Sequence, residues 1–342
     1  NLDVDLEESG FIGIATQPWH LEEIEETRAL YGRFGQTTEV LDQDAVRKRV
    51  DSPTYLSGLW IPNGKAILNP AKLVWGLRRL AESRGVVFHD DSPVLAIERL
   101  GSSLVVRTEQ GSVRARKVVV ATNAYRGPVR RIRRFIAPVY DYVLMTEPLD
   151  ASQMKAIGWS GREALEDVSN QFHYYRLTAD NRILWGGYDA IYHFNNGVGE
   201  SYDQAGDTHR ILAEHFFQTF PQLEGLRFSH RWAGPIATTT RFTATWGTSH
   251  DGDLAWVAGY TGLGVAASRF GARVALDLVE GRDSDYTRLE MVRKPPFPFP
   301  PEPFRYLGIQ ITRRAIARSD RRGGRRGPWL TILDRFGVGF DS

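Results

Sequence analysis

The spacing of apolar and polar positions predicts short elements of both kinds at the start of the chain. We expect a strand over residues 10–16, an acidic helix over about 21–31 and a second helix over 42–50. A loop then surrounds a short strand at residues 59–61. Helix and strand are therefore expected to alternate from the beginning.

The stretch NPAKLVWGLRRLAESRG, residues 69–85, predicts a well-marked helix. Asn69 can cap its start, Pro70 fits the first helical position and Gly85 can end it. The apolar positions fall on one face of this helix: Leu73, Leu77, Leu80 and Ala81.

The next segment predicts strands and a hairpin, with Glu109-Gln110-Gly111 as the turn. Residues 118–121 form a continuous apolar run, as expected of a strand that is covered on both faces. Together with the helix before them, these strands indicate an α/β layer.

Residues 137–250 are rich in aromatic and strand-forming residues and start with a long predicted strand. A single helix is expected over about 208–220, where Pro221 ends it. We interpret this region as a second, mostly antiparallel domain.

The stretch AWVAGYTGLGVAASRFGARVALDLVEG, residues 255–281, predicts strand, glycine turn and helix. Its turn fits the loose G-x-G-x-x-A pattern, but no second strand ending in an acidic residue follows Gly281, so a dinucleotide fingerprint is disfavoured. Either the turn serves tight packing alone, or its glycines let a flat ligand approach the free N–H groups of a helix that starts near Gly264.

Composition narrows the function classes. The 342 residues leave room for two domains, and 42% hydrophobic and 25% charged residues are ordinary for a globular protein. The absence of cysteine excludes disulfides, thiolate metal sites and any cofactor tethered through sulfur. The net charge of +2 does not indicate a nucleic-acid partner. No apolar run approaches the length of a transmembrane segment, and without a secretory leader we expect a cytoplasmic protein.

Seven arginines lie between Arg313 and Arg326, after a proline-rich segment. This basic tail either contacts an acidic partner or anionic membrane surface, or is a solvated basic face followed by a flexible glycine linker.

The motifs VVVATNAY (residues 118–125), AGYTGLGVAASRFGARVALDLVEG (258–281) and PNGKAILNPAKLVWGLRRLAESRGVVFHDDSPV (62–94) occur in this chain. Their sequences resemble the D-amino-acid oxidase and sarcosine oxidase superfamily of FAD-dependent oxidoreductases. Within it, the chain is most similar to the branch of the gamma-glutamylputrescine oxidoreductases.

The resemblance implies α/β plus α+β architecture: a partial, discontinuous FAD-binding domain of the glutathione-reductase-like type, with a mostly antiparallel substrate domain. The expected parts are 1–56 (substrate, helical), 57–136 (FAD-binding, middle), 137–250 (substrate), 251–290 (FAD-binding, C-terminal) and 291–342 (proline-rich and basic tail).

The same resemblance assigns a cofactor site for non-covalent FAD. The turn would lie against the pyrimidine side of the flavin, Val94 would touch the adenosine part through its backbone, and the residues after the buried strand would line the cofactor. The residues of the turn are Gly259, Gly262, Leu263, Gly264 and Val265; those after the strand are Ala121, Thr122 and Asn123.

The chain departs from the family pattern in several places. Residue 1 already corresponds to a point downstream of the family's G-x-G-x-x-G turn, so we expect the recorded chain not to be a whole translation product. Ala266 stands where sarcosine oxidases carry a carboxylate-binding lysine, which favours an amine over an amino acid, although Arg241 could substitute as an anchor. Trp185 or Leu184 stands where oxidases carry a lysine that promotes oxygen reduction, which favours another electron acceptor.

Candidate pocket residues have structural alternatives. His173 and Tyr175 share one face of a predicted strand, where His173 either accepts a proton from substrate or is a satisfied, partly buried histidine. Aromatic side chains could wall a pocket for a cationic amine or pack in the core: Trp60, Trp185 and Trp232. No histidine pair has metal-ligand spacing, so no metal site is expected.

We therefore expect an FAD-dependent oxidoreductase that oxidises the C–N bond of a small-molecule amine or amino acid by hydride transfer to flavin. The alternatives are a non-catalytic fragment that cannot hold FAD without the glycine-rich phosphate segment, and an interaction module that acts through the basic tail.

Overall fold

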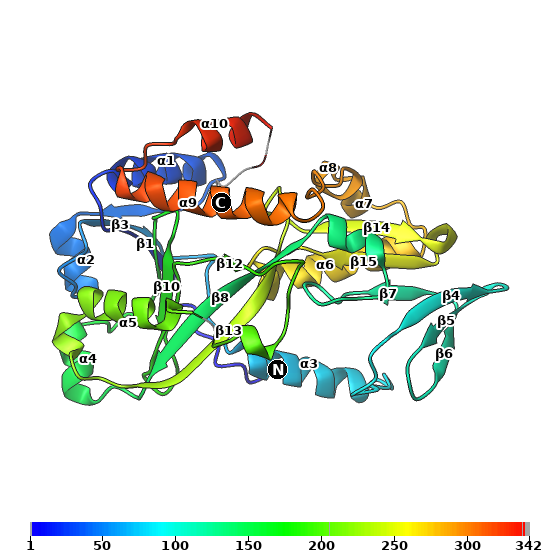
Figure 1. Cartoon of the computed structure of the whole chain (residues 1–342). Helices are drawn as coiled ribbons and strands as arrows, with labels where there is room; N and C mark the ends of the chain where they lie inside the picture. Colours follow the sequence, from blue (N-terminus) through cyan, green and yellow to red (C-terminus); the bar gives the residue numbers. More distant parts are fainter. Residues whose placement is uncertain (1, 205, 337, 339–342) are drawn as a thin grey trace.

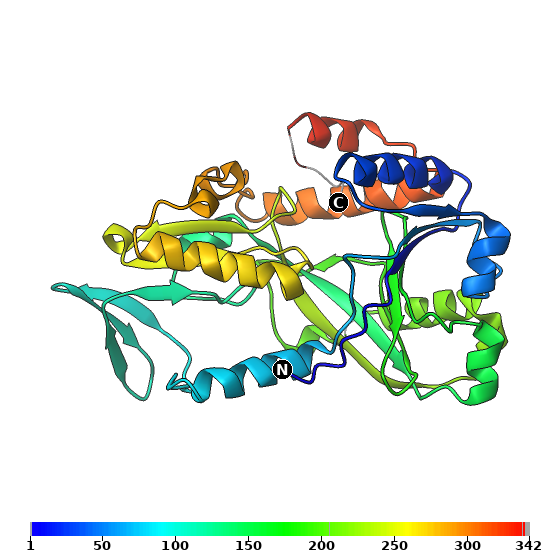
Figure 2. The same ribbon diagram turned by 180° about the vertical axis from the view of Figure 1, so that it is seen from behind.

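A computed structural model describes residues 2–204, 206–336 and 338 of the chain. Its strands form one nine-stranded sheet and two three-stranded sheets, which occupy opposite ends of an elongated molecule (Figure 1). The long strands β8 and β13 run from the large sheet toward the smaller ones, and Figure 2 shows the same arrangement from behind.

The large sheet combines strands from distant parts of the sequence. Its order is β12-β8-β11-β10-β9-β1-β3-β2, with β13 paired to the other edge of β8. Its pairs are antiparallel except that of β1 with β9. The strands are β1 (Phe11–Ala15), β2 (Glu39–Leu41), β3 (Ser57–Ile61), β8 (Ala137–Thr146), β9 (Ala164–Asp167), β10 (His173–Leu177), β11 (Ile183–Gly187), β12 (Ile191–Tyr192) and β13 (Phe228–Thr238).

Helices cover this sheet because each buries an apolar stripe. α5 (Thr208–Thr219) buries Leu212 and Phe216 among the aromatic residues of β10 and β11, and α1 (His20–Arg33) buries Ile24 against β1 and β3. The short helices α2 (Gln43–Arg49) and α4 (Ala151–Ile157) begin at side-chain caps from Asp42 and Asp150.

The two small sheets form the other end of the molecule. Parallel strands β7 (Val118–Val120) and β15 (Leu254–Ala258) pair side by side, and β14 (Thr245–Ser249) completes their sheet. The long helix α6 (Gly264–Val279) packs on β14 and β15. The second small sheet is an antiparallel meander of β4 (Ala96–Leu100), β5 (Ser103–Arg107) and β6 (Ser112–Ala115).

Local signals for α3 (Pro70–Glu82) are confirmed, since the Asn69 side chain accepts N–H bonds from Ala71 and Lys72 and Pro70 occupies the first turn. Its apolar stripe, however, is not buried: Leu77 is 50% and Leu80 is 40% exposed. The expectation that residues 118–121 are covered on both faces is likewise wrong in this structure, where Val119 is 40% exposed.

Two further expectations need correction. Residues 137–250 contain α4 in addition to the expected helix α5, because Asp150 and Gln153 form a capping box. β3 pairs with β1 and β2 in the large sheet, so the boundary expected between residues 56 and 57 falls inside that sheet.

The basic tail is packed rather than flexible over its described part. Helices α7 (Asp285–Arg288) and α8 (Glu290–Arg293) lead to α9 (Phe304–Arg321) and α10 (Pro328–Arg335), which lie beside α1 (Figure 1). Arg313 forms a bidentate ion pair with Asp189 of the large sheet. The glycine turn after α9 rests on the Trp19 ring, which a Cβ at Gly324 would approach to 2.6 Å.

Phe216 tests the importance of the α5 contact. Its ring is fully buried between Trp185, Phe220 and Phe228, so Phe216→Ala should lower the free energy of unfolding by about 3–5 kcal/mol through lost burial and a cavity. Urea denaturation measures this loss. Leu30→Ala on the exposed side of α1 is the control, and an equal loss there would contradict the assignment of the core.

Candidate functional site

The carboxyl ends of β7 and β15 form one edge of the smaller parallel sheet. Residues 121–123 follow β7, and the glycine turn, residues 259–264, follows β15. Because parallel strands end at the same edge, the two segments lie together, and the Asn123 Oδ1 accepts the Gly259 N–H at 3.3 Å. The structure therefore brings together the two segments predicted to line a cofactor.

The glycine turn needs its glycines. Gly259 and Gly262 have φ of +84° and +86°, and a Cβ on Gly259 would lie 2.3 Å from Thr239 Cγ2. The Thr261 N–H donates to the Ala237 carbonyl at 3.1 Å, which fastens the turn to the end of β13. Gly259 thus allows close packing against Thr239, and the absence of a side chain at Gly262 also leaves the main chain open to a ligand.

The amino end of α6 is uncapped. Leu263 offers no side-chain cap, and the first turn holds no acidic residue. Leu263 is 68% and Val265 53% exposed, so the free N–H groups near Gly264 are accessible. A Cβ on Gly264 would meet nothing closer than Tyr260 at 3.5 Å, which leaves room beside the helix start. These features fit the negative part of a flat cofactor ring.

Val94, predicted to contact adenosine through its backbone, precedes β4 and is 38% exposed. The neighbouring Leu95 N–H donates to the Arg107 carbonyl, whereas no such bond within the described residues is formed by the Val94 backbone. Its peptide groups are therefore available to a ligand.

The face of the large sheet that carries Asp141, hereafter the Asp141 face, contains an unforeseen polar pair. Tyr174 on β10 reaches across β11 and donates its hydroxyl to Asp141 Oδ2 on β8 at 2.5 Å. Gly186 lies between them, and a Cβ there would be 2.6 Å from the tyrosine ring. Burial raises the pKa of the Asp141 carboxyl and that of the Tyr174 phenol.

The Asp141 face leads to the glycine turn. Asp141 pairs with Gly234 on β13, and two residues further along β13 the side chain of Ile236 lies 3.9 Å from a Cβ built on Gly262. Trp232 is paired with Val143 and is 37% exposed on this same face. Of the three candidate tryptophans, Trp232 thus shares the face of the Asp141–Tyr174 pair.

Glu166 is a second half-buried carboxylate on the Asp141 face. It pairs across the strands with Tyr174 on one side and with Gly13 on the other. Burial, followed by the nearby charge of Asp167, raises its pKa to about 7, while Lys65 opposes that shift. The alternation of side chains along β9 and β10 could have indicated that Glu166 and Tyr174 point to the same side of their strands. It does not indicate which side of the sheet a helix covers.

The opposite face, hereafter the α5 face, holds the other candidates. Tyr175 and Trp185 are 2% and 1% exposed and pack together in the core, which corresponds to the core alternative given for Trp185. Tyr175 instead shares a hydrogen bond with Tyr55 at 2.8 Å. Their position follows from the side on which α5 packs.

His173 also points to the α5 face and has partners there. Its Nδ1 lies 2.7 Å from Asp167 Oδ2, and its Nε2 lies 3.0 Å from His215 Nδ1. His173 lowers the pKa of the buried Asp167 against the opposing effect of burial. This arrangement corresponds to the satisfied, partly buried histidine.

Trp60 and Arg241 have structural contacts. The Arg49 guanidinium lies 3.8 Å from the Trp60 ring centroid, and Trp60 packs against the core of the large sheet. Arg241 donates to the carbonyls of Lys294, Ala244 and Met291 and to Thr243, so its guanidinium fastens the segment after α8.

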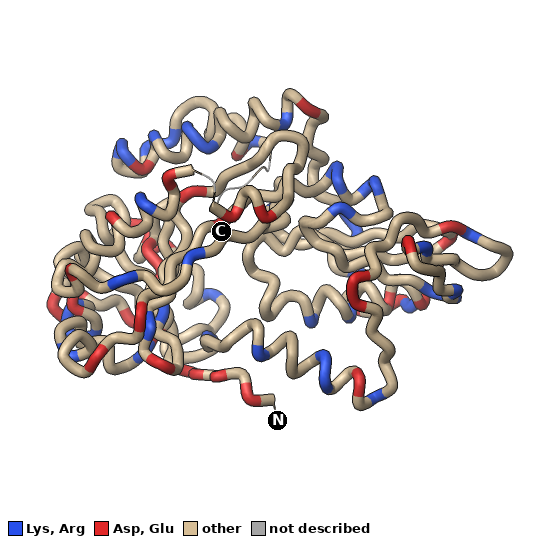
Figure 3. Tube along the Cα trace, turned by 60° about the horizontal axis from the view of Figure 1, so that its bottom comes forward, with Lys and Arg blue, Asp and Glu red and all other residues tan. Residues whose placement is uncertain are grey.

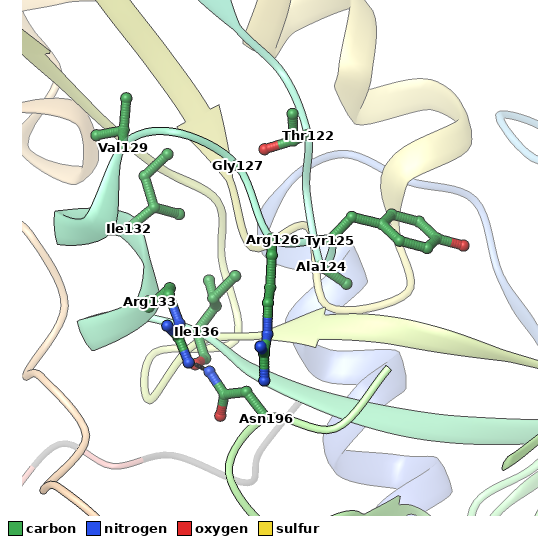
Figure 4. A pocket seen from close by; sticks show the side chains of 10 residues that line it. All are labelled: Thr122, Ala124, Tyr125, Arg126, Gly127, Val129, Ile132, Arg133, Ile136 and Asn196. Atoms are coloured by element: carbon green, nitrogen blue, oxygen red, sulfur yellow. Dashed lines mark hydrogen bonds between the residues drawn. The ribbon is translucent and has the colours of Figure 1, made fainter. Parts of the chain in front are cut away.

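A small cavity lies behind residues 121–123. Thr122 and Ile136 line it together with two arginines, Arg126 and Arg133, which Figure 4 shows on either side of Asn196. It has a volume of about 10 Å³, room for one water-sized group.

Charges are otherwise mixed along the chain, and Figure 3 shows basic and acidic positions interspersed over both ends of the molecule. Within the described residues no cluster of histidines and carboxylates could hold a metal ion. No described helix combines the length and apolar character needed to cross a membrane.

The family model described as DAO, FAD dependent oxidoreductase, matches residues 1–278 of this chain. The chain belongs to this family. Its cofactor is FAD.

Relatives of known name support this membership. The gamma-glutamylputrescine oxidoreductase of Escherichia coli (strain K12) is 30% identical over 341 residues, 98% of this chain and 73% of that protein. A probable oxidoreductase OrdL of Haemophilus influenzae is 28% identical over 278 residues. That match covers 80% of this chain and 61% of OrdL, so the chain spans less than two thirds of this relative.

Solved structures show the same mixed α/β fold. Glycine oxidase from Geobacillus kaustophilus superposes with a TM-score of 0.73 at 18% identity, covering 86% of this chain and 76% of that one. L-proline dehydrogenase from P. horikoshii gives 0.68 at 18% identity, covering 82% and 75%.

Glu166 predicts a pH dependence of stability. Because its folded-state pKa is about 7 against an ordinary 4.5, the folded protein binds more protons between these values, and stability falls as pH rises through that window. Glu166→Gln removes this titration, so the free energy of unfolding of the variant relative to the parent should increase from pH 4.5 to 7.

Urea denaturation at a series of pH values measures this difference. Glu22→Gln removes an exposed carboxylate from α1 and should follow the parent curve. A constant difference between Glu166→Gln and the parent would show that Glu166 ionises normally in the folded protein.

Proposed function

We propose that this protein oxidises the C–N bond of a small amine with FAD bound between the glycine turn and residues 121–123. One observation carries the proposal: the uncapped start of α6 and its glycine turn lie at the end of a sheet face that carries a half-buried carboxylate–tyrosine pair. A cofactor ring at the turn would have this face beside it.

Residues of the turn would hold the flavin through main-chain N–H groups, with Gly264 and Gly262 providing space and Asn123 fixing the turn. The peptide groups of Val94 would contact the adenosine part. When bound, FAD would supply a two-electron acceptor for a hydride from the carbon next to nitrogen, and the imine product would be hydrolysed by water.

The Asp141–Tyr174 pair favours a cationic substrate. A substrate amine enters as an ammonium ion, and oxidation requires that it lose a proton. Asp141 can bind the ammonium group and accept this proton, since burial raises its pKa. Tyr174 would hold the carboxylate in place, and the exposed Trp232 would provide an aromatic surface for the cation.

An amine is a better candidate than an α-amino acid in this proposal. The Arg241 guanidinium is engaged by three carbonyls and a hydroxyl, which leaves it a poor anchor for a substrate carboxylate. The name of the Escherichia coli relative makes gamma-glutamylputrescine the first compound to test. The absence of a lysine at residues 184–185 favours an acceptor other than oxygen.

The test is the visible spectrum of the protein after incubation with FAD and desalting, followed by anaerobic addition of amines. We expect bound flavin that an amine bleaches, with glycine and sarcosine as comparison substrates. A colourless protein would support the alternative that this chain cannot hold FAD. Bound flavin that no amine reduces would contradict the proposed reaction.

Gly264→Val tests the cofactor position. Within the protein the nearest atom to a new Cβ is at 3.5 Å, so the FAD-free variant should fold with unchanged or slightly higher stability. The branched side chain should weaken FAD binding by at least about tenfold, because it occupies the space beside the helix start. Titration of FAD measures the affinity; unchanged affinity would place the cofactor elsewhere.

Asp141→Asn tests the substrate face. We expect kcat/KM for an amine to fall by about 10²-fold or more, with FAD affinity unchanged, since a proton acceptor and a negative charge are lost together. Tyr175→Phe is the matched control. It removes a hydroxyl from the residue next to Tyr174 on β10, which points to the opposite, α5 face. Equal losses in the two variants would point to a general structural effect.

A further inference from the structure

The cavity behind residues 121–123 is positively charged. Two of its lining residues are arginines, Arg126 and Arg133, and none is acidic. Among the described residues neither guanidinium has a hydrogen bond or an ion pair with a carboxylate. Figure 4 shows both side chains directed toward Asn196.

Asn196 does not neutralise these arginines. Its Oδ1 already accepts bonds from Tyr192 at 2.8 Å and from a third arginine, Arg305, at 2.7 Å. Its Nδ2 donates to the Ile136 carbonyl at 3.4 Å. Asn196 is neutral and its Oδ1 is already engaged by Arg305, so it does not compensate the charge of Arg126 and Arg133, which an anion beside them would do.

Two partly buried arginines elsewhere in this protein contrast with the half-buried Arg133. Arg162 forms a bidentate ion pair with Glu7, and Arg313 does so with Asp189. At the cavity, the Thr122 hydroxyl is a further polar group without a partner in the described chain. Apolar walls from Val129, Ile132 and Ile136 would strengthen any charge interaction there.

We propose that Arg126 and Arg133 form a binding site for one small oxyanion, a carboxylate or phosphate group. The cavity has room for one oxygen atom, and the exposed Arg126 would hold a second oxygen outside it. Arginine suits this task because its planar guanidinium matches the geometry of both groups.

An anion here would join two parts of the molecule. Arg133 belongs to the 3-10 turn at residues 130–134, Arg126 to the segment after β7, and Asn196 to the loop after β12. Binding would connect the small parallel sheet, with its cofactor-lining residues, to the edge of the large sheet. This inference does not depend on the proposed reaction.

The experiment measures binding of inorganic phosphate and of acetate by isothermal titration calorimetry and by thermal denaturation, at constant ionic strength with chloride as the balancing anion. We expect saturable binding at one site and a raised melting temperature. Arg126→Gln and Arg133→Gln should each weaken binding by at least about tenfold. Arg130→Gln, in the same turn but outside the cavity, should change it by less than about twofold.

A repeat titration in the presence of FAD separates a distinct site from the cofactor's own phosphates. Binding that persists with FAD supports the proposal, whereas competition between FAD and phosphate overturns it by assigning the arginines to the cofactor. The proposal is also overturned if neither anion saturates, or if Arg130→Gln weakens binding as much as the cavity variants. The melting temperature of each variant without anion checks that it is folded.

Discussion

The antiparallel pairing of β8 with β13 is the constraint on which the rest of the structure depends. Its register runs from Ala137 opposite Thr238 to Thr146 opposite Phe228. At one end these strands belong to the large sheet, and at the other the Ala237 carbonyl holds the glycine turn. A shift of β8 by one residue would exchange its two faces, moving Asp141 to the α5 face and Tyr142 away from the core.

The two faces of the large sheet carry two separate groups of ionisable side chains. On the α5 face, Asp167, His173 and His215 satisfy one another beneath a helix. On the Asp141 face, burial raises the pKa of two carboxyl groups, those of Asp141 and Glu166. Gly186 makes the second arrangement feasible, because any side chain there would stand where the Tyr174 ring crosses β11.

Much of the local structure could be predicted from the sequence, because it depends on nearby residues. Asn69 and Pro70 mark the start of α3, and the glycines after β15 mark a turn into α6. The resemblance to a family predicted the cofactor and the order of the segments along the chain. The family membership is confirmed.

The remainder depends on contacts between residues far apart in the chain. Alternation indicates that His173 and Tyr175 share a face, but the packing of α5 decides that this face is covered. The placement of β3 in the large sheet likewise follows from its pairing with β1, about 45 residues earlier, which no local pattern encodes. The Asp141–Tyr174 pair likewise depends on the pairing of β11 with both β10 and β8.

The β8–β13 pair also fixes the distance between Asp141 and the glycine turn. Gly234, opposite Asp141, and Ala237, which holds the glycine turn, are three residues apart on one extended strand, a separation of about 10 Å. A hydrogen-bonded strand cannot stretch or shorten appreciably. Any molecule that bridged the carboxylate and the turn would have to match this separation, which is set by the backbone rather than by a side chain that a substitution could replace.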